Sequence, residues 1–384
     1  MEDILRDRTT EDERFVRIPV PSPRNGVHEL AMSGVQTYPS PKNEHVVNWG
    51  ILGAARVAKR AVGPGIQRSP NGVIHAIASR SLEKARDYAS TFGVPEAYGS
   101  YDELLKDPKV QAVYIPLPNT LHKEWTIRAA ERGKHVLCEK PLASNAAEAQ
   151  EMVDACRRNG VLLMEAFQYR LHPQTQAVKK TIDEGRIGRV VAVASVHSSS
   201  PPEEGNIRMR SDLAGGPLAD KGCYCVSIAR LFMDGEPTSV FARGDFDRDG
   251  LDWRVTADLE FQGGRMAWLD TSHKLAEGAY YQGCQIFGER GRIYIPLPFA
   301  QRPVTEQGRI VDTSFVVSSD ESMDSVEEKV NVKGVHQWQL EVEYFADRIL
   351  KSEPLGYPME DGLAQTKVMD AVYRSAREGR PERI

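Results

Sequence analysis

The sequence predicts an α/β protein with two domains: a doubly wound parallel sheet, followed by an α+β domain with a large, mostly antiparallel open sheet. Three observations support this. Short apolar runs alternate with helical periods over residues 46–166. Strand-like runs separated by short turns dominate after residue 190. The length of 384 residues suits two domains. We therefore expect domains at 46–166 and 167–384.

The alternation begins with an apolar run at 46–52, which predicts a buried strand, followed by a glycine turn into a helix. The other elements expected in the first domain are strands at 73–79, 110–117, 135–138 and 161–167 and helices at 55–68, 82–92, 122–132 and 146–159. Parallel strands joined by crossover helices bind ligands at the carboxyl edge of the sheet. Functional residues are therefore expected directly after these strands.

The second domain shows a different pattern. Strands are expected at 190–198, 239–245, 253–262, 264–273, 281–288 and 292–296. Helices are expected at about 335–351 and 359–378, and at least one of them should pack back across the domain boundary. An amphipathic sheet with one uncovered apolar face needs a cover, so this face is the expected oligomer contact.

Residues 1–45 differ in composition from the rest. Charged residues open the segment, five prolines follow, and no apolar core of a secretory signal is present. We expect an extended arm that is ordered only against the body or a neighbouring subunit; plain disorder is the alternative.

Composition narrows the function. A hydrophobic content of 41% and a charged content of 27% are those of an ordinary globular protein. A formal net charge of −5 gives no attraction to nucleic acid or anionic membranes, so the expected partner is a small molecule. The five cysteines show no metal-ligand spacing, and we expect them to be reduced in a cytoplasmic protein with no metal site.

The turn from Gly53 to Ala58 is the candidate phosphate cradle. A tight glycine turn from strand to helix directs free helix amides at a pyrophosphate, and here it also carries Arg56 and Val57. Compared with G-x-G-x-x-G, Ala55 replaces the second glycine and Ala58 the third. Alone, the turn fits a nucleotide site and a plain tight turn equally well.

The end of the second strand favours a nucleotide, because Ser79 and Arg80 occupy the place where an NAD site carries an acidic residue. A hydroxyl and a guanidinium there suit a 2′-phosphate through charge-assisted hydrogen bonds. The sequence therefore predicts NADP rather than NAD.

Glu139, Lys140 and Pro141 follow the apolar run 135–138. The proline excludes the helical region for the residue before it, so the strand must end here. Lys140 is thereby expected at the ligand-binding edge.

Five segments together resemble the glucose-fructose oxidoreductase and inositol dehydrogenase family, and most closely its branch of dimeric dihydrodiol dehydrogenases, NADP-dependent D-xylose dehydrogenases and sugar 3-ketoreductases. They are residues 49–58, 116–122, 139–141, 165–173 and 215–224. The resemblance covers about residues 46–380. It implies a Rossmann dinucleotide-binding domain, an oxidoreductase activity and a homodimer.

The resemblance assigns catalytic roles to Lys140 and Tyr224. A phenol with a pKa of about 10 is a poor base at neutral pH. A nearby ammonium would favour the phenolate and could bind the reacting oxygen, so we expect Lys140 to lower the pKa of Tyr224. Tyr224 would then relay the proton in either direction of the reaction.

Further site residues are expected around this pair. Asp220, four residues before Tyr224, could bind a substrate hydroxyl or cap the helix. His172 is a candidate substrate ligand, with a structural role at a helix start as the alternative. Arg170, Arg208 and Arg210 are further pocket candidates, with surface exposure as the alternative for each. The expected cofactor-binding residues are Gly53, Ala55, Arg56, Val57, Ser79, Arg80, Leu117, Asn119, His122, Glu139 and Lys140.

Three functions remain open at this point. The first is an NADP-dependent dehydrogenase of aldoses or cyclic diols. The second is a sugar 3-ketoreductase or glycoside oxidoreductase that uses the same machinery on another carbon. The third is a non-catalytic NADP-binding regulator, which would need neither Lys140 nor Tyr224.

Overall fold

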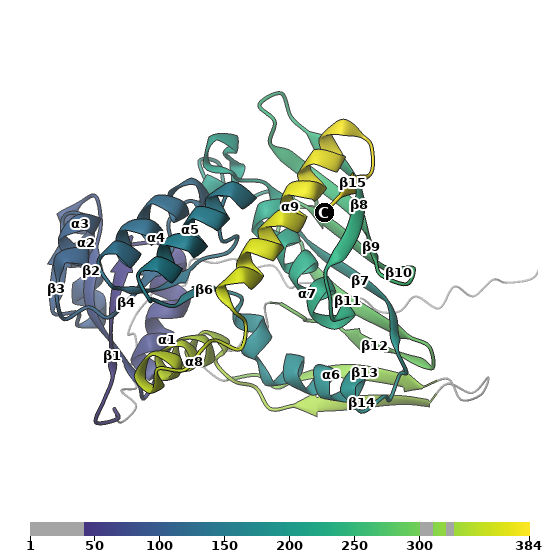
Figure 1. Ribbon diagram of the computed structural model, residues 1–384, viewed down its shortest axis with the longest axis horizontal. Coiled ribbons are helices and arrows are strands. Elements are labelled where there is room, and N and C mark those ends of the chain that lie inside the picture. The colour runs from purple at the N-terminus through teal and green to yellow at the C-terminus, as the bar shows by residue number, and fades with distance from the viewer. Residues whose placement is uncertain (1–41, 300–309, 320–325) are drawn as a thin grey trace, which may run out of the picture. The chain divides into compact units, whose positions relative to one another are not determined.

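The structure is a computed structural model that describes residues 42–299, 310–319 and 326–384 (Figure 1). The arm expected at 1–45 therefore lies almost entirely outside the described residues.

The first sheet contains six parallel strands in the order β3-β2-β1-β4-β5-β6. The strands are β1 (Val47–Leu52), β2 (Gly72–Ala78), β3 (Glu96–Tyr98), β4 (Ala112–Ile115), β5 (His135–Cys138) and β6 (Leu163–Glu165). The order reverses between β1 and β4, so the carboxyl ends of these two strands flank a crevice. The doubly wound parallel sheet is thus confirmed.

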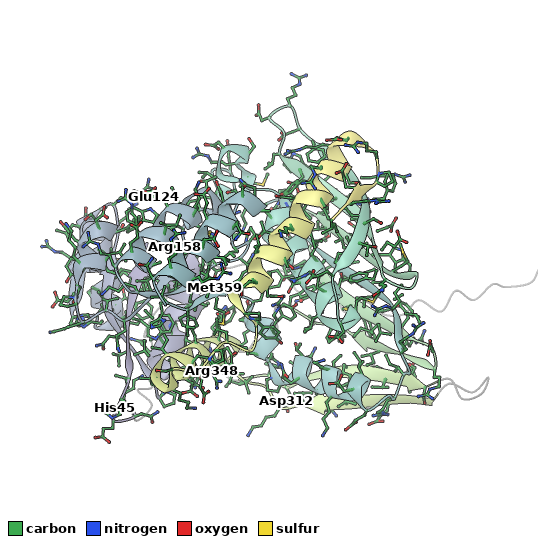
Figure 2. All side chains as sticks on the ribbon, in the orientation of Figure 1. His45, Glu124, Arg158, Asp312, Arg348 and Met359 are labelled. Atoms are coloured by element: carbon green, nitrogen blue, oxygen red, sulfur yellow. The ribbon has the colours of Figure 1, made fainter. Side chains whose placement is uncertain are left out.

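Helices cover both faces of this sheet. Helices α3 (Tyr101–Lys106), α4 (His122–Glu131) and α5 (Ala146–Arg158) share one buried apolar cluster. The opposite face is covered by α1 (Gly63–Arg68), α2 (Leu82–Phe92) and α8 (Gln337–Lys351). Helix α8 comes from the end of the chain, as expected of a helix that packs back. Polar side chains such as Glu124 and Arg158 cover α4 and α5 on the outside (Figure 2).

Local sequence explains how these helices begin. The Ser81 hydroxyl accepts a hydrogen bond from the Lys84 amide at 3.3 Å and caps α2. The Asn145 side chain accepts one from the Glu148 amide at 3.0 Å and caps α5. Both are favoured residues for satisfying the first free amides of a helix.

The second sheet contains nine strands in the order β14-β13-β12-β11-β7-β10-β9-β8-β15. They are β7 (Val190–Ser199), β8 (Pro237–Phe246), β9 (Asp252–Phe261), β10 (Arg265–Ser272), β11 (Tyr280–Gly288), β12 (Gly291–Ile295), β13 (Thr313–Ser319), β14 (Val326–Val332) and β15 (Glu382–Arg383). The pair β7 and β10 is parallel and the other pairs with a register are antiparallel, so the mostly antiparallel sheet is also confirmed.

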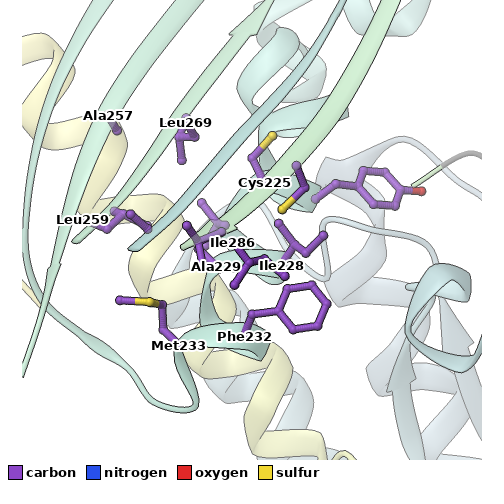
Figure 3. Close-up of a cluster of buried hydrophobic side chains, with 14 of the residues drawn as sticks. Cys225, Ile228, Ala229, Phe232, Met233, Ala257, Leu259, Leu269 and Ile286 are labelled. Carbon is purple, nitrogen blue, oxygen red and sulfur yellow. The ribbon is translucent and has the colours of Figure 1, made fainter. Parts of the chain in front are cut away.

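Three helices bury one face of this sheet: α6 (Pro173–Asp183), α7 (Cys223–Met233) and α9 (Met359–Glu378). Figure 3 shows Ile228 and Phe232 of α7 among the side chains that pack with Leu259 and Ile286 of the strands. This packing fixes the start of α7, where Tyr224 lies.

The sequence did not predict β3, α3, β13, β14 or β15. Strands β3 and β15 have three and two residues, too few to show a period. Strand β14, with the sequence VEEKVNV, is an edge strand whose charged residues hide the alternation.

Candidate active site

A cavity of about 200 Å³ lies between the carboxyl edge of the first sheet and the start of α7. From the first sheet it is lined by Val57, Leu117, Asn119, Glu139 and Lys140. From the second domain it is lined by Gln168, Arg208, Asp220 and Tyr224. Candidates from five separate stretches of the sequence therefore meet in one place.

Lys140 follows β5 and reaches across to the second domain. Its Nζ donates to the backbone oxygen of Asp220 at 2.6 Å and lies 3.5 Å from Asp220 Oδ1. The ammonium also lies over the ring of Tyr224, 4.9 Å from the centroid. Burial lowers the pKa of Lys140, but Asp220, Cys223 and Glu139 together outweigh burial and the net pKa shift is upward. Lys140 is therefore a stable ammonium.

Tyr224 is the second residue of α7, directly after a π-helical turn at Leu218–Gly222. Its hydroxyl donates to Gln168 Oε1 at 3.3 Å, and its ring contacts Phe167, His197 and Phe299 with centroids 5.3 to 5.5 Å apart. Buried aromatic contacts of this kind hold the ring in one orientation.

The expected lowering of the Tyr224 pKa is wrong for this arrangement. Burial raises the pKa of Tyr224 well above its ordinary value, and the charge of Glu139 raises it further. Burial is the largest cause of this shift, and the Lys140 ammonium over the ring does not offset it. The phenol keeps its proton at neutral pH.

Asp220 is surrounded by cations. Oδ1 accepts from Arg208 Nε at 2.7 Å, and Oδ2 accepts from Lys221 Nζ at 2.7 Å. Burial raises the pKa of Asp220, but Arg208, Lys221 and Lys140 outweigh it and hold the pKa well below the ordinary value. Asp220 is therefore an ionised carboxylate whose position depends on these partners.

The turn after β1 fits a pyrophosphate. Gly53 has a φ of 119°, and a Cβ there would lie 2.9 Å from Leu117 Cδ2, so glycine is required. The helix begins at Arg56, and the amides of residues 54–57 have no acceptor among the described residues. Unpaired amides at a helix start favour an anion.

The residues after β2 differ from each other. Ser79 is mostly buried and its hydroxyl accepts from the Ser81 amide at 3.3 Å. Arg80 is exposed and has no ion pair to a carboxylate within the described ranges. Arg80 is thus the group available to a 2′-phosphate, and Ser79 contributes mainly to the turn.

His122 was expected to contact the cofactor, but its ring is fully buried. Its Nδ1 lies 3.0 Å from the Pro141 oxygen and its Nε2 lies 2.9 Å from the Leu117 oxygen. Burial lowers the pKa of His122. The ring therefore ties together the loops after β4 and β5, and it does not face the cavity.

The other predicted cofactor residues after these strands are better placed. Glu139 Oε1 accepts from the Tyr114 hydroxyl at 2.6 Å, which orients the carboxylate at the cavity. Asn119 Nδ2 donates to the Ala214 oxygen at 2.7 Å and ties the first domain to the loop at 207–215.

Two predicted substrate ligands do not line the cavity. His172 is 1% exposed and its Nδ1 accepts from the Gln174 amide, so it caps α6. Burial lowers its pKa to about 4. Arg170 forms a buried ion pair with Asp361 of α9 and donates to Ser227 at 3.0 Å. Both side chains are held by structural partners. This agrees with the structural alternative for His172, whereas Arg170 is 6% exposed and its alternative of surface exposure is wrong. Arg210, a lesser candidate, pairs with Asp212.

Gln168, Lys221 and His273 surround the site although the sequence did not single them out. Gln168 follows the last strand of the first sheet, and its position at the carboxyl edge was a usable signal. Lys221 is adjacent to the predicted Asp220, but nothing in the sequence gave it a role. His273 gave no signal, because its proximity arises from a contact with a distant segment.

Within residues 42–299, 310–319 and 326–384, no group of three or more His, Cys, Asp or Glu side chains could hold a metal ion. In the same part of the chain, no helix has the length and apolar character needed to cross a membrane. All five cysteines are buried and unbridged.

The fold agrees with comparisons to known proteins. Residues 47–167 match the oxidoreductase family with an NAD-binding Rossmann fold, and residues 175–294 match the GFO/IDH/MocA C-terminal domain. The chain belongs to this family of oxidoreductases, which confirms the resemblance seen in the sequence.

Individual relatives act on sugars or diols. The chain is 38% identical to D-xylose 1-dehydrogenase (NADP(+)) 2 of Haloferax volcanii, over 86% of this chain and 98% of that protein. It is 31% identical to trans-1,2-dihydrobenzene-1,2-diol dehydrogenase of Xenopus laevis, over 84% and 98%. A 3-ketoreductase from Actinomadura kijaniata, solved with NADP and TDP-benzene, superposes with a TM-score of 0.78 at 31% identity, covering 86% and 98%.

Proposed function

We propose that this protein is an NADP-dependent oxidoreductase that transfers hydride between an aldose or cyclic diol and the nicotinamide. The observation that supports this most directly is that Lys140 and Tyr224 line one cavity, with Lys140 Nζ 4.9 Å from the ring centroid. The Actinomadura ketoreductase has also been solved as variants of one lysine and one tyrosine, which are separated by the same number of residues as this pair.

The bound nicotinamide would accept or deliver hydride at the substrate carbon. Lys140 would donate a hydrogen bond to the reacting oxygen and stabilise negative charge there. The Tyr224 hydroxyl would give its proton to a carbonyl during reduction and be left as the phenolate. Oxidation would run in reverse, from a phenolate that has first released its proton and then takes the proton of the alcohol. Asp220 would accept a hydrogen bond from a second substrate hydroxyl while it holds Lys140.

The cofactor would lie across the crevice between β1 and β4. The amides of residues 54–57 would bind the pyrophosphate, and Arg80 would bind the 2′-phosphate. Leu117, Asn119 and Glu139 would flank the nicotinamide and its ribose. The Haloferax relative is an NADP(+) dehydrogenase by name and the Actinomadura ketoreductase was solved with NADP, which supports NADP over NAD.

The test is to add D-xylose, D-glucose, glycosides and a cyclic trans-diol separately to the purified protein with NADP⁺ or NAD⁺ and to follow nicotinamide absorbance. Reduction of NADP⁺ by one class of substrate supports the proposal and identifies that class. Cofactor binding without reduction by any of these compounds contradicts it and favours the non-catalytic regulator or a different substrate.

A sugar 3-ketoreductase is the second candidate. The observation in its favour is that Tyr224 keeps its proton, because a protonated phenol is the form that donates to a carbonyl. The same assay run with NADPH and a 3-keto sugar separates the two candidates by the substrate that reacts faster.

We further propose a homodimer formed by the uncovered face of the second sheet. A row of paired residues crosses this face on five adjacent strands: Trp268, Ala194, Gln285, Tyr294 and Val316. Trp268 is 43% exposed, and apolar side chains of this size at the centre of a sheet favour a protein cover.

A further inference from the structure

Lys221 is a buried lysine that the proposed chemistry does not use. It lies in the π-helical turn before α7 and is 7% exposed. Its Nζ donates to Asp220 Oδ2 at 2.7 Å and to His273 Nε2 at 2.9 Å. A buried ammonium is costly unless its partners are well placed, so this arrangement is a specific feature of the site.

The two oxygens of Asp220 face different sides. Oδ2 faces the interior, where Lys221 Nζ is 2.7 Å and His273 Nε2 is 3.5 Å away. Oδ1 faces the cavity, where Arg208 Nε is 2.7 Å and Lys140 Nζ is 3.5 Å away. Rotation of the carboxylate would break the short bond to Lys221, so this bond fixes the direction of Oδ1.

We propose that Lys221 is a positioning residue: it holds Asp220 Oδ2, so that Oδ1 is shared between Arg208 and Lys140 and the Lys140 ammonium stays in the cavity. This inference rests on the proposed function, in which Lys140 binds the reacting oxygen. Without Lys221, Asp220 turns toward Lys140 and forms a tighter ion pair that withdraws the ammonium from the substrate.

The groups around Lys221 make its charge dependent on pH. Burial lowers the pKa of Lys221; Asp220 opposes this, Lys140 and Arg208 add to it, and the net pKa shift is downward. His273 and His197 face the same cluster, and burial lowers the pKa of each, so both rings are neutral. Lys221 therefore loses its proton at a lower pH than an ordinary lysine, and the positioning is lost on the alkaline side.

Kinetics of Lys221→Met and Lys221→Arg test this, with Lys134→Met as the matched control. Lys134 is also 7% exposed and donates to two backbone oxygens at 2.7 and 2.8 Å, but it does not line the cavity. We expect Lys221→Met to lower kcat by about tenfold, equivalent to about 1.4 kcal/mol, with little change in the KM for NADP⁺.

The pH profile separates positioning from a merely structural role. Lys221→Arg should keep activity to higher pH than the wild type, because arginine does not lose its proton. Lys134→Met should keep the wild-type profile. An alkaline limb of the pH profile that is unchanged in Lys221→Arg contradicts the proposal. Because Lys221→Arg retains the charge, it still provides the test if Lys221→Met does not fold.

An NMR titration of the His273 ring gives a readout that needs neither cofactor nor substrate. In Lys221→Met a neighbouring positive charge is gone and Asp220 Oδ2 is free to accept from His273, so the midpoint should rise by about one pH unit. No rise overturns the positioning role, whatever the activity. If the midpoint of the His273 titration rises but the protein turns over no sugar or diol, the proposed arrangement of Asp220 stands and only the proposed function is refuted.

Discussion

The ammonium of Lys140 lies over the ring of Tyr224, 4.9 Å from its centroid. The phenol oxygen is bonded to Gln168 and the ammonium to Asp220. The two groups therefore act as separate donors that reach one cavity from two domains. A substrate oxygen that accepts from both would gain two charge-stabilising contacts at the atom where charge develops.

Replacing either donor should abolish turnover but leave the cofactor bound. We expect Lys140→Met and Tyr224→Phe each to lower kcat by about 100- to 10,000-fold, the usual contribution of a proton-transfer group. Cofactor affinity, measured by quenching of protein fluorescence, should change only a few-fold. The control is Tyr373→Phe, which changes a partly buried tyrosine on α9 whose hydroxyl bonds Asp252 at 3.4 Å. Full activity in either site variant would remove that residue from the mechanism.

Arg80 should determine the choice between NADP and NAD. Its exposed guanidinium follows β2, where the ribose 2′-position is expected. Because a hydrogen bond to a charged group contributes about 1.5–3 kcal/mol, Arg80→Ala should lower the NADP-to-NAD preference in kcat/KM by roughly 10- to 100-fold. Arg86→Ala, an exposed arginine on α2, should leave it unchanged. An unaltered preference in Arg80→Ala would show that other groups read the phosphate.

Gly53→Ala should damage both stability and cofactor binding. The φ of 119° is strained for alanine, and the new Cβ would lie 2.9 Å from Leu117 Cδ2. We expect a loss of about 1–3 kcal/mol in the free energy of unfolding, with weaker NADP⁺ binding. Gly93→Ala isolates the backbone effect, because its φ is 62° and a Cβ there meets nothing within 4 Å. Equal NADP⁺ affinity in both variants would argue against the cradle.

The sequence predicted elements that depend on local pattern. Strand ends, glycine turns and the proline after Lys140 are encoded within a few residues, and these determined which backbone positions reach the ligand-binding edge. Lys140, Glu139 and Asn119 were located in this way.

Side-chain direction depends on partners that no local pattern reveals. His122 follows a strand end, but its ring points inward because two backbone oxygens lie there. Arg170 is drawn to Asp361, a residue 191 positions later in the chain. The pKa of Tyr224 likewise depends on burial among side chains from separate elements, so its direction could not be read from residue types.

The buried carboxyl group of Glu165 should make the free energy of unfolding decrease as pH rises. Its Oε2 is buried without a partner in the described part of the chain, and burial raises its pKa to about 8 from an ordinary 4.5. The folded state therefore binds the proton more tightly than the unfolded state between these pH values, so stability decreases across this window. Glu165→Gln keeps the oxygen that accepts from the Leu142 amide at 2.9 Å and removes the charge.

The difference in melting temperature between Glu165→Gln and the wild type should be near zero at pH 4 and largest above pH 8. Above pH 8, Glu165→Gln should gain roughly 1–3 kcal/mol in the free energy of unfolding, which is the usual cost of a buried unsatisfied group. Glu131→Gln, an exposed site at the end of α4, should give no pH-dependent difference. A constant difference from pH 4 to pH 9 would refute the assignment.

Trp268→Glu should dissociate the proposed homodimer without unfolding the chain. Trp268 is 43% exposed and pairs across the sheet with Ala194, so a charge there is tolerated in a monomer but not in an apolar contact. Loss of one central tryptophan contributes about 2 kcal/mol or more, so the dimer should weaken by about 30-fold or more in sedimentation velocity. Leu82→Glu, at a 38% exposed position on α2, should leave it unchanged. If the wild-type protein sediments as a monomer at micromolar concentration, no surface of this chain forms the contact. If Trp268→Glu keeps the wild-type association constant, another surface forms it.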